Sequence, residues 1–172
     1  MHNMETAESN IQFKPETLKE IDRIIKQFPE GKQKSAILRI LHMAQEEFGN
    51  WLSVDVMDYV SRLLHIQPIE VYEVASFYSM YNLNPVGKVV IEFCHTGPCC
   101  LVGAEKILKH IQTSLNIKTG ETSSDGIFTL KAAECLGACG YGPMPQIGET
   151  YYENLTEEKV DNLLLTLRTK HS

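Results

Sequence analysis

The sequence predicts an α+β protein, in which an N-terminal helical bundle of residues 1–84 is followed by an α/β domain of residues 85–172. Three observations support this prediction. Apolar residues recur at helical spacing in successive segments of the first half. The period changes at residues 82–88, after which segments typical of strands and helices alternate. All five cysteines lie in the second half, in two short loops that each follow a predicted strand.

The N-terminal half is predicted to form four helices, which begin near Pro15, Ile37, Ser53 and Pro68. Proline suits the first helical position, because its missing N–H would have no partner there, and serine is a common helix cap. The fourth predicted helix covers residues 69–81 and is apolar almost all round. A helix of this kind is either buried in a bundle or packed against a partner, and both interpretations remain open.

The C-terminal half is predicted to have the order β-α-β-β-β-α, at residues 88–93, 100–115, 125–135, 144–147, 151–152 and 156–167. The two short strands would form a hairpin around Gly148, with Tyr151 as an ordinary strand residue. The first helix would bury Leu101 on the same apolar face as Ala104 and Ile107. This order of elements permits an α/β sandwich of the thioredoxin-like kind.

The charge balance excludes some function classes. The chain carries 16 Lys+Arg against 22 Asp+Glu, a net charge of −6, and an acidic protein has little with which to neutralise nucleic-acid phosphates. No apolar run approaches the ~20 residues of a membrane span, and residues 1–16 lack the apolar core of a signal peptide. We therefore expect an unexported or processed protein in a reducing compartment, where clustered cysteines bind metals or perform redox chemistry more often than they form disulfides.

The cysteines lie in CHTGPCC, residues 94–100, and CLGAC, residues 135–139. Their spacings differ from the C-x-x-C of a dithiol catalyst. A cysteine nucleophile with His95 as its base would leave four cysteines unexplained. Two pairs of thiolates suit either a structural zinc site or a [2Fe–2S] cluster, and spacing alone favours neither.

The loop composition favours the iron–sulfur cluster, although zinc would accept the same surroundings. Gly97 and Pro98 turn the first loop, and the glycines of residues 137–142 leave backbone N–H groups open around the second pair. An anionic cluster is stabilised by such donors and by a helix N-terminus. Five apolar residues are expected to keep water off one side: Leu101, Val102, Leu136, Met144 and Pro145. The segment 137–142 lacks the order of a dinucleotide fingerprint, so no nucleotide site is expected.

Two segments carry a resemblance to a known family. CHTGPC at residues 94–99 and IKTGETSSDGIFTLKAAECLGACGYGPMPQIGETYYENLT at residues 117–156 resemble the 24-kDa-type ferredoxin subunit of respiratory complex I, the proton-pumping NADH:quinone oxidoreductase. The likeness covers nearly the whole chain, including FYSMYNL at residues 77–83. In that family a thioredoxin-like domain carries one [2Fe–2S] cluster, and the resemblance implies the ligands Cys94, Cys99, Cys135 and Cys139. The family commonly has Asn-Ala where this chain has Tyr141 and Gly142.

The resemblance also implies a function and partners. We expect an electron-transfer subunit that is not catalytic alone and that holds its cluster close to the FMN of an NADH-oxidising partner subunit, among further iron–sulfur subunits. Independently of the resemblance, the helical half has no candidate ligand set but carries the largely apolar helix of residues 69–81, so we expect it to dock the chain onto that partner. The expected location is the peripheral arm of a membrane complex on the cytoplasmic side, or the mitochondrial matrix for a processed eukaryotic chain. The alternatives are the equivalent subunit of an NAD-linked formate dehydrogenase or hydrogenase, and a four-cysteine zinc-stabilised interaction module.

Cys100 is expected to be the cysteine that does not bind the metal. With a helix that begins near Cys100, Cys99 would lie at the helix mouth, where the helix dipole favours a thiolate. Cys100 would point away by the ~100° that separates successive helical residues. We expect it to pack as a small buried residue near Ala104 and Ile107.

Overall fold

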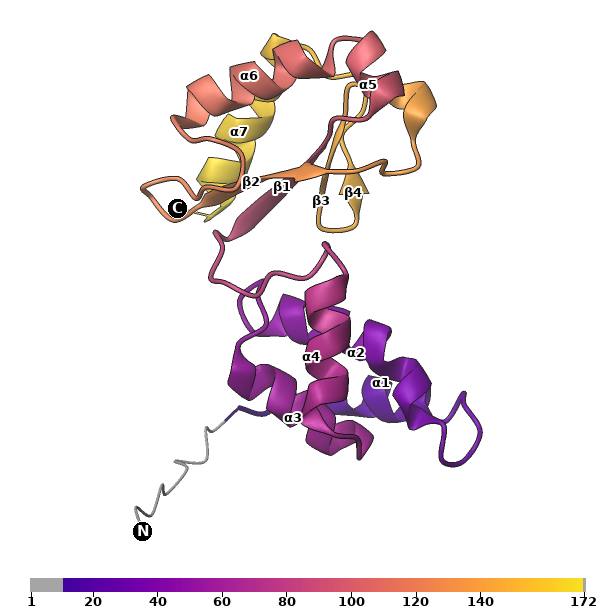
Figure 1. The fold of residues 1–172 in the computed structure, drawn as a ribbon. Helices are drawn as coiled ribbons and strands as arrows, with labels where there is room; N and C mark the ends of the chain where they lie inside the picture. Colours follow the sequence, from indigo (N-terminus) through magenta and orange to yellow (C-terminus); the bar gives the residue numbers. More distant parts are fainter. Residues whose placement is uncertain (1–10, 172) are drawn as a thin grey trace. The chain divides into compact units, whose positions relative to one another are not determined.

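The computed structural model describes residues 11–171, which divide into two compact units. Residues 1–10, where no signal peptide is expected, lie outside this range. The first unit ends at Pro85 and is helical, whereas the second begins at Val86 and contains a four-stranded sheet (Figure 1). Each unit encloses its own core of buried apolar side chains. Among the described residues, no helix is long and apolar enough to span a membrane.

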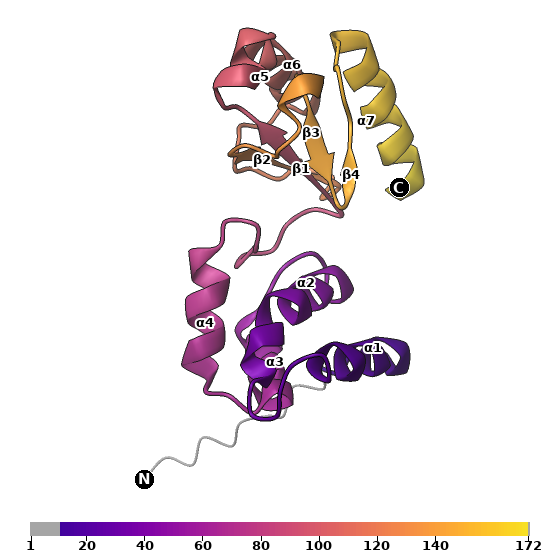
Figure 2. The same cartoon turned by 90° about the vertical axis from the view of Figure 1, so that its right-hand side faces the viewer.

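The first unit contains α1 (Pro15–Ile25), the 3₁₀ turn η1 (Gln33–Ala36), α2 (Ile37–Glu47), α3 (Val54–Leu64) and α4 (Pro68–Phe77), which confirms the predicted helices. Helices α2, α3 and α4 pack against one another (Figure 2). Ser53 caps α3 as predicted, because its Oγ accepts a hydrogen bond of 3.3 Å from the backbone N–H of Val56.

The fourth helix is shorter than predicted and ends at Phe77 instead of continuing to residue 81. A tertiary contact explains the early end. The Gln45 side chain on α2 donates to the carbonyl of Met80 at 3.1 Å and accepts from the backbone N–H of Asn82 at 2.7 Å. This amide therefore holds the chain after α4 in a turn, and Tyr81 enters the core with its hydroxyl 2.8 Å from the carbonyl of Leu38.

The bundle buries only part of the apolar surface of α4. Val71 and Ala75 are buried, whereas Ile69 is 58% exposed and Phe77 is 79% exposed. The interpretation of α4 as a bundle helix is thus correct for one side of it. The other side keeps an apolar surface that the described residues do not cover.

The second unit follows the predicted order, with the first helical segment divided into two. Its strands are β1 (Val89–Cys94), β2 (Phe128–Ala133), β3 (Pro145–Ile147) and β4 (Thr150–Tyr151), and its helical elements are α5 (Gly97–Leu101), α6 (Ala104–Leu115), η2 (Cys139–Tyr141) and α7 (Glu157–His171). The sheet order is β2-β1-β3-β4. The pair β1–β2 is parallel, and the other two pairs are antiparallel.

One core joins the sheet to its two long helices. Helices α6 and α7 lie side by side (Figure 1), and Lys106 pairs with Glu157 at 3.3 Å while His110 pairs with Asp161 at 2.8 Å. Alternate residues of β1 point into the core, as the pleat requires, and meet apolar residues of β2 and both helices: Val89, Ile91, Phe93, Phe128, Leu130, Ile107, Ile111, Val160 and Leu164. The sheet is therefore a rigid base for the loops that follow β1 and β2.

The prediction of one continuous helix over residues 100–115 is wrong. Helix α5 ends at Leu101, and α6 begins at Ala104. Gly103 separates them with a φ of +95°, a backbone conformation that glycine adopts without steric cost. Because of this break Leu101 is 89% exposed, and the expectation that it packs with Ala104 is also wrong.

Candidate metal centre

The first cysteine loop starts at the end of the central strand. Cys94 is the last residue of β1, and its backbone N–H donates to the carbonyl of Met144 at 3.2 Å. Its Sγ lies 3.4 Å from the hydroxyl of Thr96. Cys99 follows inside α5, and both cysteines are 1% exposed. The scaffold thus fixes the first pair in a buried position.

The second cysteine loop follows β2 and is exposed. The Sγ atoms of Cys135 and Cys139 are 3.5 Å apart. The backbone N–H of Gly137 donates to the Sγ of Cys135 at 3.4 Å. Gly137 has a φ of +82°, so the loop bends back over its own first cysteine in a way that other residues rarely allow.

The structure brings the two pairs together. The backbone N–H of Leu136 hydrogen-bonds to the sulfur of Cys94, which links the second loop to the first. Burial raises the pKa of Cys99 to about 12, and hydrogen bonding and charge from its neighbours act in the same direction: Cys94, Cys139 and Cys135. The hydrogen bond and charge of Cys135 likewise raise the pKa of Cys139. Four thiolates this close repel one another, and a bound cationic centre relieves that repulsion.

Hydrogen bonding makes Cys94 the exception within this group. Burial alone would raise the pKa of its thiol, but hydrogen bonds from Thr96, Cys99 and the Leu136 backbone outweigh burial and lower the pKa. Donors that favour a thiolate also favour metal ligation, because the thiolate is the metal-binding form.

The fifth cysteine points elsewhere. The Sγ of Cys100 donates to the carbonyl of His95 at 3.1 Å, within its own loop. Cys100 is half-buried, so the expectation that it packs as a fully buried residue near Ala104 and Ile107 is wrong. The helix that carries it begins at Gly97, earlier than predicted.

The four cysteines that are expected to be ligands fall into two pairs, which is the arrangement that a [2Fe–2S] cluster uses. A structural zinc needs four ligands around one ion, whereas a [2Fe–2S] cluster takes two thiolates at each iron. Cys94 with Cys99 and Cys135 with Cys139 would supply two such pairs. Cys94 ends β1, and Cys135 lies just beyond the end of β2 at Ala133.

The apolar surroundings are only partly as expected. Met144 and Pro145 are buried beside the first loop, and Leu136 is half-buried. The expectation that Leu101 and Val102 exclude water is wrong, because both are exposed on and after the short helix α5. The cysteine site therefore has a closed side towards the sheet and an open side towards α5 and the second loop.

Two residues near the cysteines have roles that sequence reasoning missed. A Cβ at Gly142 would lie 3.1 Å from the Sγ of Cys99. The hydroxyl of Tyr151 donates to the carbonyl of Leu136 at 2.7 Å. The departure from the family at residues 141–142 was a signal that could have drawn attention to Gly142. No sequence pattern indicates the hydrogen bond of Tyr151 to a backbone carbonyl.

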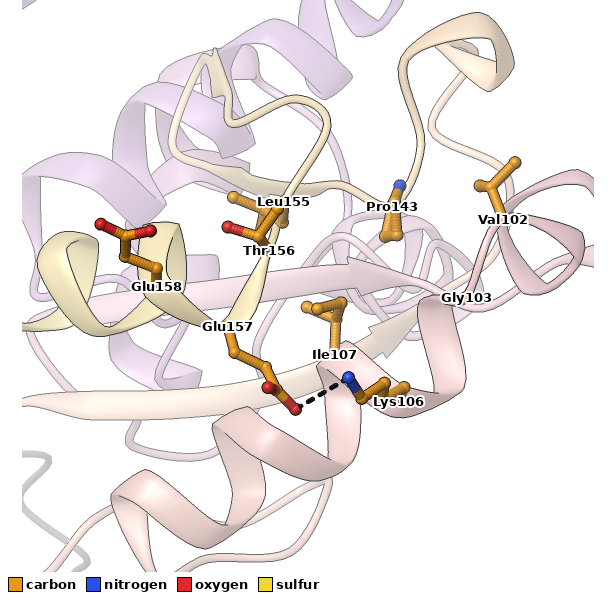
Figure 3. Close-up of a pocket in the computed structure, with 9 residues that line it drawn as sticks. All are labelled: Val102, Gly103, Lys106, Ile107, Pro143, Leu155, Thr156, Glu157 and Glu158. Atoms are coloured by element: carbon orange, nitrogen blue, oxygen red, sulfur yellow. Dashed lines mark ion pairs between the residues drawn. The ribbon is translucent and has the colours of Figure 1, made fainter.

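A separate cavity of about 430 Å³ lies between the N-terminal ends of α6 and α7. Its lining residues are Val102, Gly103, Lys106, Ile107, Pro143, Leu155, Thr156, Glu157 and Glu158. Figure 3 shows the ion pair between Lys106 and Glu157 across it. Glu157 already pairs with the ammonium group of Lys106, and Glu158 adds a second carboxylate to the lining. These negative charges offset the positive ends of the two helices, so the cavity is not an anion-binding site.

Comparison with known proteins places the chain in a family. Residues 21–168 match the model of the thioredoxin-like [2Fe-2S] ferredoxin family. A protein of Rickettsia felis that is named as a subunit of NADH-quinone oxidoreductase is 45% identical over 91% of this chain and 93% of its own length. The mitochondrial NADH dehydrogenase [ubiquinone] flavoprotein 2 of Dictyostelium discoideum is 39% identical over 94% of this chain and 67% of its own length.

A solved structure shares the fold. The chain aligns with an NAD+-reducing [NiFe]-hydrogenase in the air-oxidized state with a TM-score of 0.68 and 19% identity, over 80% of this chain and 23% of the hydrogenase chain. This agreement confirms the predicted α+β, thioredoxin-like architecture. With the match over residues 21–168, the chain belongs to the thioredoxin-like [2Fe-2S] ferredoxin family.

Proposed function

We propose that this chain is an electron-transfer subunit of an NADH-quinone oxidoreductase and that it holds one [2Fe–2S] cluster. The proposed ligands are Cys94, Cys99, Cys135 and Cys139. The observation that carries the proposal is the meeting of two cysteine pairs at the ends of the parallel strands β1 and β2. The proposed assembly is that of relatives at 42–45% identity, which are named as subunits of NADH-quinone oxidoreductase.

The protein groups around the sulfurs have defined roles in this proposal. When bound, such a cluster supplies one-electron redox chemistry. The Thr96 hydroxyl and the Leu136 N–H stabilise the thiolate of Cys94, and the Gly137 N–H stabilises that of Cys135. These donors offset negative charge, which a thiolate-ligated cluster carries in both redox states.

The exposure of the two pairs indicates the side from which electrons arrive. Cys94 and Cys99 are buried against the sheet, whereas Cys135 and Cys139 are exposed. Electron transfer becomes slower with distance, so a redox partner would approach over the second loop. We propose that this partner is an NADH- and FMN-binding subunit, that the cluster lies close to its FMN, and that further iron–sulfur subunits complete the complex.

The assembly also determines the location. As a subunit of this complex the chain would lie in its peripheral arm, on the cytoplasmic side in a bacterium or in the matrix in a mitochondrion. The relatives include bacterial proteins and one named as mitochondrial. The chain is then an oxidoreductase only as part of the complex, because the catalytic site for NADH would lie on the partner.

A second assembly contains a chain with the same fold. The fold is shared with part of an NAD+-reducing hydrogenase chain, so an equivalent subunit of a hydrogenase or an NAD-linked formate dehydrogenase remains an alternative. At 19% identity the likeness concerns the fold alone. Isolation of the chain with its natural partners decides the matter: quinone-side membrane subunits support the proposal, and a hydrogenase or formate dehydrogenase subunit overturns it.

Metal analysis tests the cluster itself. Protein purified without oxygen should be reddish-brown and should contain iron and acid-labile sulfide in equal amounts, about two of each per chain. Reduction with dithionite should bleach the visible absorption. Colourless protein with one bound zinc would refute the electron-transfer function and establish the zinc-stabilised module instead.

A further inference from the structure

Tyr151 connects the outermost strand of the sheet to the second cysteine loop. It lies on β4, and its hydroxyl donates to the backbone carbonyl of Leu136 at 2.7 Å. The ring is 43% exposed, so core packing is not its main contribution. The contact spans 15 residues of sequence and ends between the two cysteines of the loop, Cys135 and Cys139.

The accepting carbonyl belongs to the peptide that also contacts a cysteine. The carbonyl of Leu136 and the N–H of Gly137 are the two ends of one peptide group, and that N–H donates to the Sγ of Cys135 at 3.4 Å. A hydrogen bond to the carbonyl polarises the peptide and strengthens the N–H as a donor. Tyr151 and the sulfur are therefore linked through a single peptide plane.

The strand pairing gives this link a fixed origin. Tyr151 pairs with Gln146 of β3, and the backbone N–H of Tyr152 donates to the carbonyl of Pro145 at 3.0 Å. Pro145 in turn pairs with Phe93 of β1, next to Cys94. The hydroxyl that orients the second cysteine loop is thus held by the same sheet that carries the first loop.

We propose that Tyr151 is a positioning residue that sets the reduction potential of the cluster through the Leu136–Gly137 peptide. This inference rests on the cluster proposed above. Reduction adds negative charge, and hydrogen bonds to the sulfurs are one of the factors that set the potential. A polarised N–H at Cys135 stabilises the reduced form, so the Tyr151 hydroxyl raises the potential.

The test compares two neighbouring tyrosines in the full chain. Tyr151→Phe removes the hydroxyl and keeps the ring, and Tyr152→Phe is the matched control, because Tyr152 packs on the core. The measurement is a redox titration followed by the electron paramagnetic resonance (EPR) signal of the reduced protein. We expect a more negative potential for Tyr151→Phe and no change for Tyr152→Phe.

A stronger hydrogen-bond donor at position 151 should shift the reduction potential in the opposite direction. A fluorinated tyrosine at position 151, studied at a pH below the pKa of its phenol, keeps the hydrogen bond and polarises the peptide more. Its potential should shift in the positive direction. If Tyr151→Phe takes up less iron, the fluorinated variant alone still tests the proposal, because it retains the hydrogen bond to Leu136.

The outcomes separate this inference from the proposed function. Wild-type protein without a [2Fe–2S] cluster would overturn the proposed function. Wild-type protein with the cluster, but with equal potentials for Tyr151→Phe and Tyr152→Phe and no shift with the fluorinated residue, would overturn the role of Tyr151 alone.

Discussion

Gly142 packs directly against Cys99, and a Cβ at this glycine would lie 3.1 Å from the Sγ of Cys99 and 3.1 Å from Cγ2 of Val102. The segment around Gly142 has little freedom to retreat. The carbonyl of Tyr141 accepts from the N–H of Asn154 at 2.8 Å, and the carbonyl of Pro143 accepts from Leu155 at 2.9 Å. The Cys99 sulfur therefore has room in its position because residue 142 has no side chain.

We expect Gly142→Ala to disturb the cluster by displacing the Cys99 sulfur. Val102 is 53% exposed and has room to move, whereas Cys99 is buried and held by α5. The EPR spectrum of the reduced protein should change in Gly142→Ala. The control is Gly140→Ala, because a Cβ at Gly140 would meet nothing within 4 Å although it lies beside Cys139.

A double substitution separates the two contacts of the added methyl group. Gly142→Ala with Val102→Ala removes the contact with Val102 but keeps the contact with the Cys99 sulfur, so the spectrum should stay changed. An unchanged spectrum in the single variant, or the same change in Gly140→Ala, would show that this packing does not position the sulfur.

The two adjacent cysteines should respond differently to substitution by serine. Cys100→Ser should keep the cluster spectrum, because its Sγ donates to the carbonyl of His95 and a hydroxyl makes the same bond. Cys99→Ser should change or abolish the spectrum, as should serine at Cys94, Cys135 or Cys139. Since serine sometimes ligates iron through oxygen, a shifted signal also counts as a change.

The same measurement identifies the outcome that contradicts this assignment. A perturbed EPR spectrum in Cys100→Ser together with an unchanged one in Cys99→Ser would exchange the roles of the two residues. Iron content per chain, measured in parallel, distinguishes a shifted cluster from a lost one.

Local sequence signals were sufficient for the start of most elements. Pro15 and Pro68 open helices and Ser53 caps one, because these preferences depend on the residue and its immediate neighbours. Long-range contacts explain the misses. The end of α4 depends on Gln45, which lies 35 residues before the carbonyl that it binds. Such a contact leaves no mark on helical periodicity.

At the cysteine site, too, short sequence patterns were predictable and contacts between distant residues were not. The two cysteine loops were evident from spacing, and the four proposed ligands followed from a family resemblance. The break at Gly103 was missed because a glycine inside an apolar pattern is compatible with a continuous helix until its φ is known. The contacts of Gly142 and Tyr151 depend on where the chain returns after the second loop, which is a property of the fold.

Tyr81 should stabilise the helical unit through its buried hydroxyl. It donates to the carbonyl of Leu38 at 2.8 Å, and the residue is 5% exposed. Tyr81→Phe leaves that carbonyl without this donor, so the free energy of unfolding should fall by about 1 kcal/mol. Chemical denaturation followed by circular dichroism measures the difference, and Tyr141→Phe, at a residue that is 54% exposed, is the control.

The same residue gives the unit an alkaline sensitivity. Burial, with a smaller contribution from Tyr78, raises the pKa of Tyr81 in the folded protein. The folded state favours the neutral phenol of Tyr81. This contribution to stability is fully present below the unfolded tyrosine pKa of about 10, and it is lost as the pH rises from there through the higher pKa of the folded protein. Wild type should lose more stability than Tyr81→Phe over this range, and equal losses would contradict the assignment.

The exposed side of α4 should be the docking surface of the helical unit. Phe77 is 79% exposed and meets Tyr78 ring edge to ring face at 5.1 Å, and Ile69 is 58% exposed on the same helix. Aromatic residues often supply most of the binding energy at interfaces. Phe77→Lys should therefore weaken co-purification with the NADH-binding subunit by about tenfold or more, while changing the stability of the isolated chain by less than about 0.5 kcal/mol.

The matched control is an exposed leucine on the other unit. Leu165 on α7 is 67% exposed, so Leu165→Lys places the same charge on a comparable apolar site. Retained binding in Leu165→Lys with loss in Phe77→Lys supports docking through α4, because only the position of the charge differs. Loss in Leu165→Lys with retention in Phe77→Lys would instead place the docking surface on the unit that carries the cysteines.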